Sequence, residues 1–191
     1  DEYAHDNAYV TQVREYAESL ITWECEIIKR YSETNIGVYK NLGLGARWIF
    51  SIEECAIFLE DDNLPEVSFF KYCEEMLERY RDDDRILWVC GTNYLQNYAP
   101  SDGSSYMFTK HSLPCGWASW SNKFLEFYDH DLSGLSIEGI ESKIKYSYQN
   151  KALYKQEMDV IKKTQYFLNE DISRASWDRQ MVFSLRRNSQ F

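Results

Sequence analysis

The chain has 191 residues, of which 44% are hydrophobic and 16% aromatic, and its formal net charge is −10. This hydrophobic content excludes a disordered or low-complexity chain, and the length suits one domain with a sizeable core. A surface this acidic argues against nucleic acids and anionic membranes as partners. Because an acidic protein that binds an anionic substrate usually needs a cation between the two, the charge also hints at a divalent metal.

Hydrophobic spacing in the first half of the chain predicts alternating helices and strands. In chain order, we expect a helix over 10–20, a strand over 23–31, a helix over 39–50, a buried strand over 55–59, a helix over 69–80 and a buried strand over 86–91. Both buried strands are short unbroken apolar runs, as is typical of strands covered on two faces. This alternation predicts an α/β fold with a mostly parallel sheet flanked by helices.

The second half of the chain is predicted to be mainly helical. After an edge strand over 106–110, helical patterns follow near 119–128, 137–148, 154–169 and 177–187. The sequence contains no repeat, low-complexity tract or convincing linker, so we expect a single domain over 1–191. We also expect that domain to be truncated at both ends, because Asp1 opens a polar lead-in and Phe191 directly follows a helical pattern.

Cysteine usage and hydropathy bear on the cellular compartment. The five cysteines are an odd number without a Cys-x-x-Cys pair, which favours a reduced, cytoplasmic protein. No apolar run reaches the roughly 18–20 residues of a membrane span, and no signal peptide opens the sequence. We therefore expect no integral membrane segment.

An acidic triplet, Glu60-Asp61-Asp62, directly follows the buried strand predicted over 55–59. Acidic side chains at the carboxyl end of a parallel sheet lie where open α/β sheets bind ligands. Because clustered carboxylates repel one another, they favour a bound cation, and oxygen ligands suit Mg²⁺ or Mn²⁺ shared with a substrate diphosphate. The alternative is a solvated loop that caps the next helix. The acidic run at 82–84, which follows a helix, is interpreted as such a solvated turn.

Two further segments carry residues suited to sugar chemistry. Gly116 permits a close backbone approach or a positive φ, and Trp117 beside it offers a flat ring to a sugar. Asp178 lies in the first turn of the last predicted helix, where the helix dipole favours a negative charge, so it could act as a general base toward a hydroxyl. The structural alternatives are a loop-to-helix junction with core tryptophans and simple helix capping.

Together these segments resemble GT-A fold glycosyltransferases, and the nearest relatives we can name are the N-acetylglucosaminyltransferase I family and its bacterial counterparts. Those proteins share a hydrophobic strand, an acidic triplet, a helix that opens with paired Phe (here Phe69 and Phe70), a Pro/Gly/Trp segment and a Trp-Asp pair. The likeness covers roughly residues 10–190. It implies a GT-A, Rossmann-like fold and an enzyme of glycan biosynthesis that uses a nucleotide-sugar. The family's first strand has no counterpart before Asp1.

The resemblance implies a role for each matching position. Asp62 would be the direct ligand of Mn²⁺ or Mg²⁺, and Asp178 would be the catalytic base. The positions that would bind the nucleotide-sugar are Glu60 and Asp61 on the ribose and diphosphate side, Gly116 and Trp117 beside the sugar and acceptor, and Asn35, Gly37 and Arg47 on the nucleotide side.

The implied reaction moves a sugar from a nucleotide diphosphate-sugar, with UDP favoured, to a hydroxyl of a glycan or another acceptor. A single displacement with Asp178 as base would invert the anomeric centre, since no second acid is placed for retention. Two alternatives stay open. One is a non-catalytic transferase-like domain that binds glycans or partner proteins. The other is a metal-dependent sugar nucleotidyltransferase, although the Gly-rich basic loop expected for a triphosphate is missing.

Overall fold

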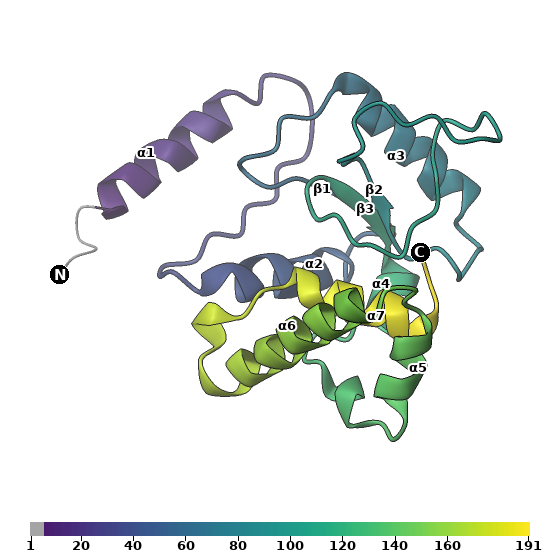
Figure 1. Cartoon of the computed structure of the whole chain (residues 1–191). Coiled ribbons are helices and arrows are strands. Elements are labelled where there is room, and N and C mark those ends of the chain that lie inside the picture. The colour runs from purple at the N-terminus through teal and green to yellow at the C-terminus, as the bar shows by residue number, and fades with distance from the viewer. Residues whose placement is uncertain (1–5) are drawn as a thin grey trace. The chain divides into compact units, whose positions relative to one another are not determined.

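The computed structural model describes residues 6–191, and its contacts divide the chain into two compact units, residues 1–34 and residues 35–191. The first unit contains one helix, α1 (Asp6–Ser19), which is purple in Figure 1 and confirms the helix predicted over 10–20. Residues 20–34 are irregular, so the strand predicted over 23–31 is wrong.

Side chains, and not a strand ladder, hold the segment over 23–31 in the first unit. The Glu18 carboxylate accepts a hydrogen bond from the Tyr31 hydroxyl at 2.9 Å, and the Arg14 guanidinium donates to the Ser32 carbonyl at 3.0 Å. A strand needs a partner for its backbone N–H and C=O groups, and the described residues of this unit offer none.

The second unit contains a sheet of three short strands, β1 (Cys55–Phe58), β2 (Val89–Cys90) and β3 (Trp117–Trp120). Their order is β1-β3-β2, and both pairings are antiparallel. The predicted mostly parallel sheet of a GT-A, Rossmann-like fold is therefore wrong. The two strands expected to be neighbours, β1 and β2, do run in the same direction, but β3 lies between them.

The unexpected strand β3 comes from the Pro/Gly/Trp segment, which the sequence presents as a loop leading into a helix. All four of its residues are buried, so it lacks the alternation of polar and apolar residues that identifies a strand with one exposed face. The predicted edge strand over 106–110 is also wrong, since that segment is irregular.

The remaining elements of this unit are helical. They confirm the helices predicted from sequence, with shifted ends, and add two 3₁₀ turns, which were not predicted. They are the π-helical turn η1 (Tyr39–Gly43), α2 (Leu44–Ile49), α3 (Val67–Arg79), α4 (Ser121–Phe127), the 3₁₀ turn η2 (Ser133–Ser136), α5 (Ile140–Tyr146), α6 (Lys151–Glu170), the 3₁₀ turn η3 (Ile172–Arg174) and α7 (Asp178–Asn188).

Helices cover both faces of the small sheet (Figure 1). Trp117 of β3 packs with Phe124 of α4 and Met181 of α7 on one face. Ala118 and Trp120 pack against α3 on the other face. This division follows from the alternation of side chains along a strand, and it makes β3 the centre of both cores.

A buried lysine fixes the turn that follows α3. Lys123 of α4 is 1% exposed, and its ammonium group donates hydrogen bonds to the carbonyl oxygens of Tyr80, Asp83 and Ile86 at 2.5, 2.8 and 3.1 Å. Burial lowers the pKa of Lys123. The acidic run at 82–84 is thus a turn, and one of its carboxylates binds the guanidinium of Arg85 at 2.7 Å.

Candidate functional site

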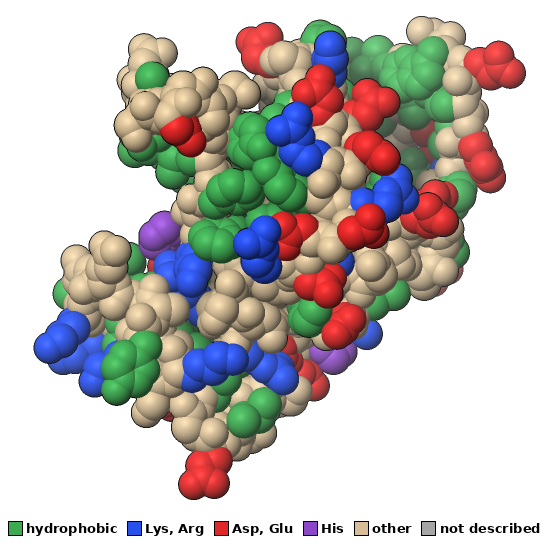
Figure 2. Space-filling model, turned by 90° about the vertical axis from the view of Figure 1, so that its right-hand side faces the viewer, with side chains coloured by type: hydrophobic (Ala, Val, Ile, Leu, Met, Phe, Trp, Pro, Cys, Tyr) green, Lys and Arg blue, Asp and Glu red, His purple; other side chains and the backbone are tan. Residues whose placement is uncertain are grey.

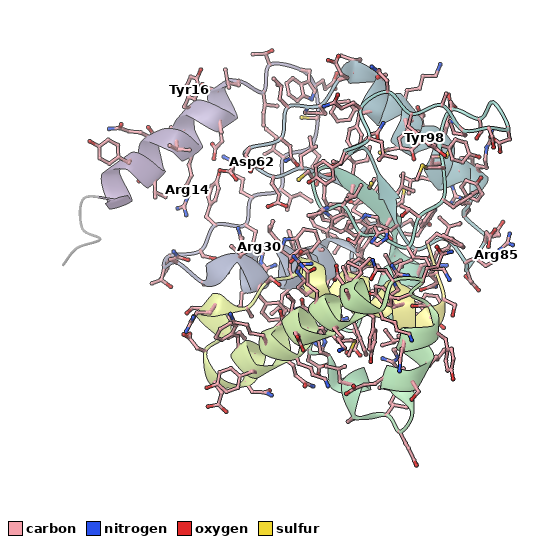
Figure 3. The ribbon with its side chains drawn as sticks, viewed as in Figure 1. Arg14, Tyr16, Arg30, Asp62, Arg85 and Tyr98 are labelled. Atoms are coloured by element: carbon pink, nitrogen blue, oxygen red, sulfur yellow. The ribbon has the colours of Figure 1, made fainter. Side chains whose placement is uncertain are left out.

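The acidic triplet occupies a tight turn directly after β1. The Glu60 N–H donates to the side-chain oxygen of Asn63 at 3.0 Å, and the Asn63 N–H donates to the Glu60 carbonyl at 3.1 Å. The Asn63 amide also donates to the Asp62 carboxylate at 2.9 Å. Asp61 and Asp62 are exposed, whereas Glu60 is partly buried. In Figure 3 the loop that carries Asp62 projects away from the sheet.

The structure brings Asp178, far along the chain, close to this triplet. Burial raises the pKa of Glu60, and repulsion from Asp62, Asp178 and Asp61, in that order, raises it further. Asp178 is the first residue of α7, and its carboxylate lies 3.4 Å from the Arg179 guanidinium. Carboxylates from two separate segments therefore act on Glu60 electrostatically.

A stack of aromatic rings holds the two acidic segments in place. The Trp117 ring stacks on Phe58 at a centroid distance of 4.0 Å, on Trp88 at 4.2 Å and on Trp177 at 5.5 Å. Phe58 lies just before the acidic triplet and Trp177 just before Asp178. The Trp117 side chain is only 3% exposed, because the rings of Phe58 and Trp88 stack against it. Trp117 therefore positions the site, and the prediction that its ring contacts a sugar is wrong.

Gly116 fits the backbone at the start of β3 to the acidic loop. Its φ is +71°, and a Cβ there would lie 3.5 Å from the Leu59 side chain and 3.4 Å from the Phe69 ring. The Gly116 carbonyl also accepts a hydrogen bond from the Gly91 N–H at 3.0 Å. A positive φ disfavours residues with a side chain, so glycine at 116 has a structural reason.

The turn at Asn35 and Gly37 packs against the segment that leads to Asp178. The Asn35 side chain accepts a hydrogen bond from the Gly37 N–H at 2.9 Å. Gly37 has a φ of +79°, and a Cβ there would lie 3.3 Å from the carbonyl oxygen of Ser173 in η3. This turn therefore lies against η3, the element that precedes α7 in the chain.

Arg47 of α2 belongs to the same neighbourhood. Burial raises the pKa of Tyr128 well above its ordinary value, Asp178 raises it further, and Arg47 lowers it. The Tyr128 hydroxyl donates to the Trp177 carbonyl at 2.9 Å, directly before Asp178. Arg47 and Asp178 thus act on one buried tyrosine that contacts the backbone at the start of α7.

Sequence reasoning missed two residues that shape this site. Gly43, in the π-helical turn η1, is so tightly enclosed that a Cβ would lie 3.1 Å from the Trp177 side chain and 3.2 Å from the Tyr128 hydroxyl. Asn63 folds the acidic turn, as described above. An Asn after an acidic run is a recognisable turn signal, but the role of Gly43 depends on a contact that no local pattern reveals.

Polar atoms without a protein partner lie next to Asp178 in sequence. Among residues 6–191, the side-chain oxygens Ser176 Oγ and Gln180 Oε1 are buried and make no hydrogen bond. The Gln180 amide nitrogen donates to the Ser176 carbonyl at 2.7 Å. Buried polar atoms of this kind are usually satisfied by water or a ligand.

A metal at the acidic turn would have to be shared with a substrate, because the described residues do not enclose a metal site. Within the described residues, no three or more His, Cys, Asp or Glu side chains are grouped so that they could hold a metal ion. The exposed carboxylates of Asp61 and Asp62 could supply the one or two protein ligands through which Mg²⁺ is often bound together with substrate phosphates. Two surface hollows, one beside Tyr72 and Phe191 and one beside β1, contain none of these site residues.

Comparison of the chain with protein-family models, curated proteins and solved structures gives no significant match. Across residues 6–191, no helix combines the length and the apolar character needed to cross a bilayer. All five cysteines are free thiols, and burial raises the pKa of Cys73 to about 12.

Proposed function

We propose that this protein is a metal-dependent glycosyltransferase that moves a sugar from a nucleotide diphosphate-sugar, with a UDP-sugar favoured, to a hydroxyl of a glycan or another acceptor. The observation that carries this proposal is that Asp178, from a separate helix, lies close enough to Glu60 of the acidic triplet to raise its pKa. The arrangement of the acidic residues supports the proposal. The overall architecture does not, because the sheet differs from the one that the sequence resemblance implies.

The acidic residues divide naturally into two roles. Asp62 is exposed and would hold Mn²⁺ or Mg²⁺, which supplies charge neutralisation at the leaving diphosphate. Glu60 and Asp61 would contact the ribose and diphosphate side of the donor. Asp178, on a separate helix, would accept the proton of the acceptor hydroxyl as that oxygen attacks the anomeric carbon.

The backbone around these acids would position the donor. The turn at Asn35 and Gly37, with Arg47 nearby, would border the nucleotide, whereas Gly116 is buried against Leu59 and Phe69 and would act only through the backbone of β3. A single displacement assisted by one base inverts the anomeric centre.

A second function, binding of glycans or partner proteins without catalysis, is favoured by one observation. Within residues 6–191, no group of His, Cys, Asp or Glu side chains could by itself hold a metal ion. A binding domain needs no such group, whereas an enzyme would need the donor itself to complete the site.

Thermal unfolding with Mn²⁺ and UDP separates the two functions. A ligand that binds only the folded protein raises the unfolding midpoint, so the transferase predicts a rise with Mn²⁺ and UDP together that exceeds the rise with either one. Asp62→Ala should remove this joint effect, and Asp82→Ala, which removes an exposed carboxylate from the other acidic run, should retain it. No joint rise with any nucleotide would contradict the transferase and support the binding domain.

A further inference from the structure

The sheet ends in an open edge at β1. Within residues 35–191, β1 pairs with β3 alone. The Ser121 N–H donates to the Glu54 carbonyl at 2.8 Å, so hydrogen-bonded pairs in this ladder recur at every second residue from Glu54. It follows that Cys55 and Ile57 direct their backbone N–H and C=O groups away from β3.

A groove runs along this edge. It measures about 440 Å³ and is lined by Cys55, Ala56 and Ile57 of β1 together with Glu74, Leu77, Glu78 and Arg81, which lie in α3 and just beyond its end. Leu77 is 8% exposed and belongs to the core under the sheet. The groove thus offers an apolar floor beside the outward-facing backbone groups of Cys55 and Ile57.

The edge lacks most of the features that natural proteins use to prevent strand addition. The strand β1 contains no Lys, no Pro and no charged residue, and its residues are Cys, Ala, Ile and Phe. Unprotected edges readily pair with another chain. The strand is short, so an added strand would be held by few backbone hydrogen bonds and its side chains must contribute to recognition.

The charge of the groove selects among possible occupants. Its carboxylates are Glu74, Glu78 and the neighbouring Glu54, and its only guanidinium among the lining residues is that of Arg81. Arg81 already lies 2.8 Å from Glu78 and 3.8 Å from Glu54, which leaves an acidic excess. A second copy of this chain would set these same acids against one another, and each copy carries a net charge of −10. On the face of the molecule drawn in Figure 2, acidic and basic side chains are interspersed.

We propose that the open edge of β1 is a docking site for an extended, basic peptide segment of a partner protein. The segment adds a fourth strand to the sheet through hydrogen bonds to the backbone of Cys55 and Ile57. Every second side chain of the added strand faces α3. Lys or Arg at these positions contacts Glu74 and Glu78. Such strand addition takes its affinity from the backbone and its specificity from alternate side chains. This docking site is independent of the transferase activity proposed above.

The test uses three fluorescent hexapeptides and the whole chain under reducing conditions. The peptides are Lys-Val-Lys-Val-Lys-Val, Glu-Val-Glu-Val-Glu-Val, and the first sequence with alternate backbone nitrogens methylated. Fluorescence anisotropy should show that the unmodified Lys peptide binds at least about tenfold more tightly than either other peptide. This factor corresponds to about 1.4 kcal/mol of binding free energy. Equal binding of the methylated peptide would reduce the effect to charge attraction and overturn strand addition.

Two variants locate the binding. Cys55→Pro removes an outward N–H without breaking a β1–β3 hydrogen bond, and Pro is tolerated at the first residue of an edge strand, so this variant should lose Lys-peptide binding. The double change Glu74→Lys with Glu78→Lys alters exposed helix positions and should reverse the preference toward the Glu peptide. Unchanged binding by both variants would overturn the proposal. A dimer in sedimentation that Cys55→Pro dissolves would assign the edge to a second copy instead, and would equally overturn it.

Discussion

At the scale of single residues, the candidate site depends on acids that the fold holds close together at a cost in stability. Glu60 is the clearest case, because it is partly buried and three other carboxylates act on it. Asp178 differs from it in having a cationic neighbour, Arg179, at 3.4 Å. Under the proposed function, Asp178 would accept the proton of the acceptor hydroxyl and the triplet would hold the cation.

The assignment of Asp178 as base predicts a specific loss. Asp178→Asn keeps the size of the side chain and removes its basicity, so sugar transfer should fall by about 10²–10⁴-fold while Mn²⁺-dependent UDP binding persists. Steady-state transfer assays and titration calorimetry measure the two properties. Asp159→Asn, on the exposed face of α6, should change neither. Full turnover by Asp178→Asn would exclude this residue as the base.

The raised pKa of Glu60 predicts a pH-dependent stability. A carboxyl whose folded-state pKa lies above its ordinary value of 4.5 binds more protons when folded, so its ionisation lowers the free energy of unfolding as pH rises above 4.5. Glu60→Gln should therefore stabilise the protein at pH 7 by up to about 1 kcal/mol, given solvent screening of this partly exposed group.

Urea unfolding at pH 7 and pH 4 tests this expectation for Glu60. The stabilisation by Glu60→Gln should shrink toward zero at pH 4, where the native carboxyl is largely protonated. Glu126→Gln, an exposed position on α4, serves as the matched control and should have little effect at either pH. A Glu60→Gln variant that is less stable at pH 7 would show that the charge is already compensated within the protein.

At the scale of elements, close packing of Phe69 fixes where α3 meets the sheet. A Cβ on Gly91, just after β2, would fall inside the contact distance of the Phe69 ring, and a Cβ on Gly116 would lie 3.4 Å from it. The Phe69 ring therefore lies over two glycines at the ends of β2 and β3. This packing also supports the acidic loop, because Leu59 lies 3.5 Å from the same Gly116 position.

Gly91→Ala should consequently destabilise the protein. Forcing a methyl group against a packed ring typically costs about 1–3 kcal/mol, and denaturant unfolding measures this cost. Gly45→Ala is the control, because nothing lies within 4 Å of its Cβ position in α2. Replacing a helical glycine by alanine there should stabilise the protein by about 0.5–1 kcal/mol. Equal effects of the two substitutions would mean that the Phe69 ring moves aside freely.

At the scale of the whole molecule, the hydrophobic cores belong to one unit. The three clusters of buried side chains are drawn from residues 39–191, and the first unit contributes polar contacts among its own residues. The second unit also contains every residue assigned to the candidate site. Folding and ligand binding are therefore both expected to be properties of residues 35–191.

Removal of residues 1–34 tests this independence. The shortened chain should unfold in one cooperative transition, with a urea midpoint close to that of the whole chain, because its cores are complete. Near-ultraviolet circular dichroism should keep the signal of the stacked tryptophans. Loss of the cooperative transition would show that the first unit stabilises the second.

The sequence by itself determined most of the helices and the strand β1, because both depend on local periodicity and composition. It also placed the acidic turn directly after β1 and Asp178 at the start of α7. These features need only neighbouring residues to form. Asp62 and Asp178 are the residues at which experiments test the proposed function.

Only the tertiary structure decided the sheet and the surroundings of the acids. Pairing β3 between β1 and β2 joins residues distant in sequence, and nothing in the buried run over 117–120 states its partner or direction. The same is true of Trp117, whose ring is enclosed by Phe58 and Trp88, and of Lys123, whose ammonium group fixes three carbonyl oxygens. Local sequence patterns indicate whether a side chain is buried. They do not indicate which side chains, distant in the sequence, pack against it.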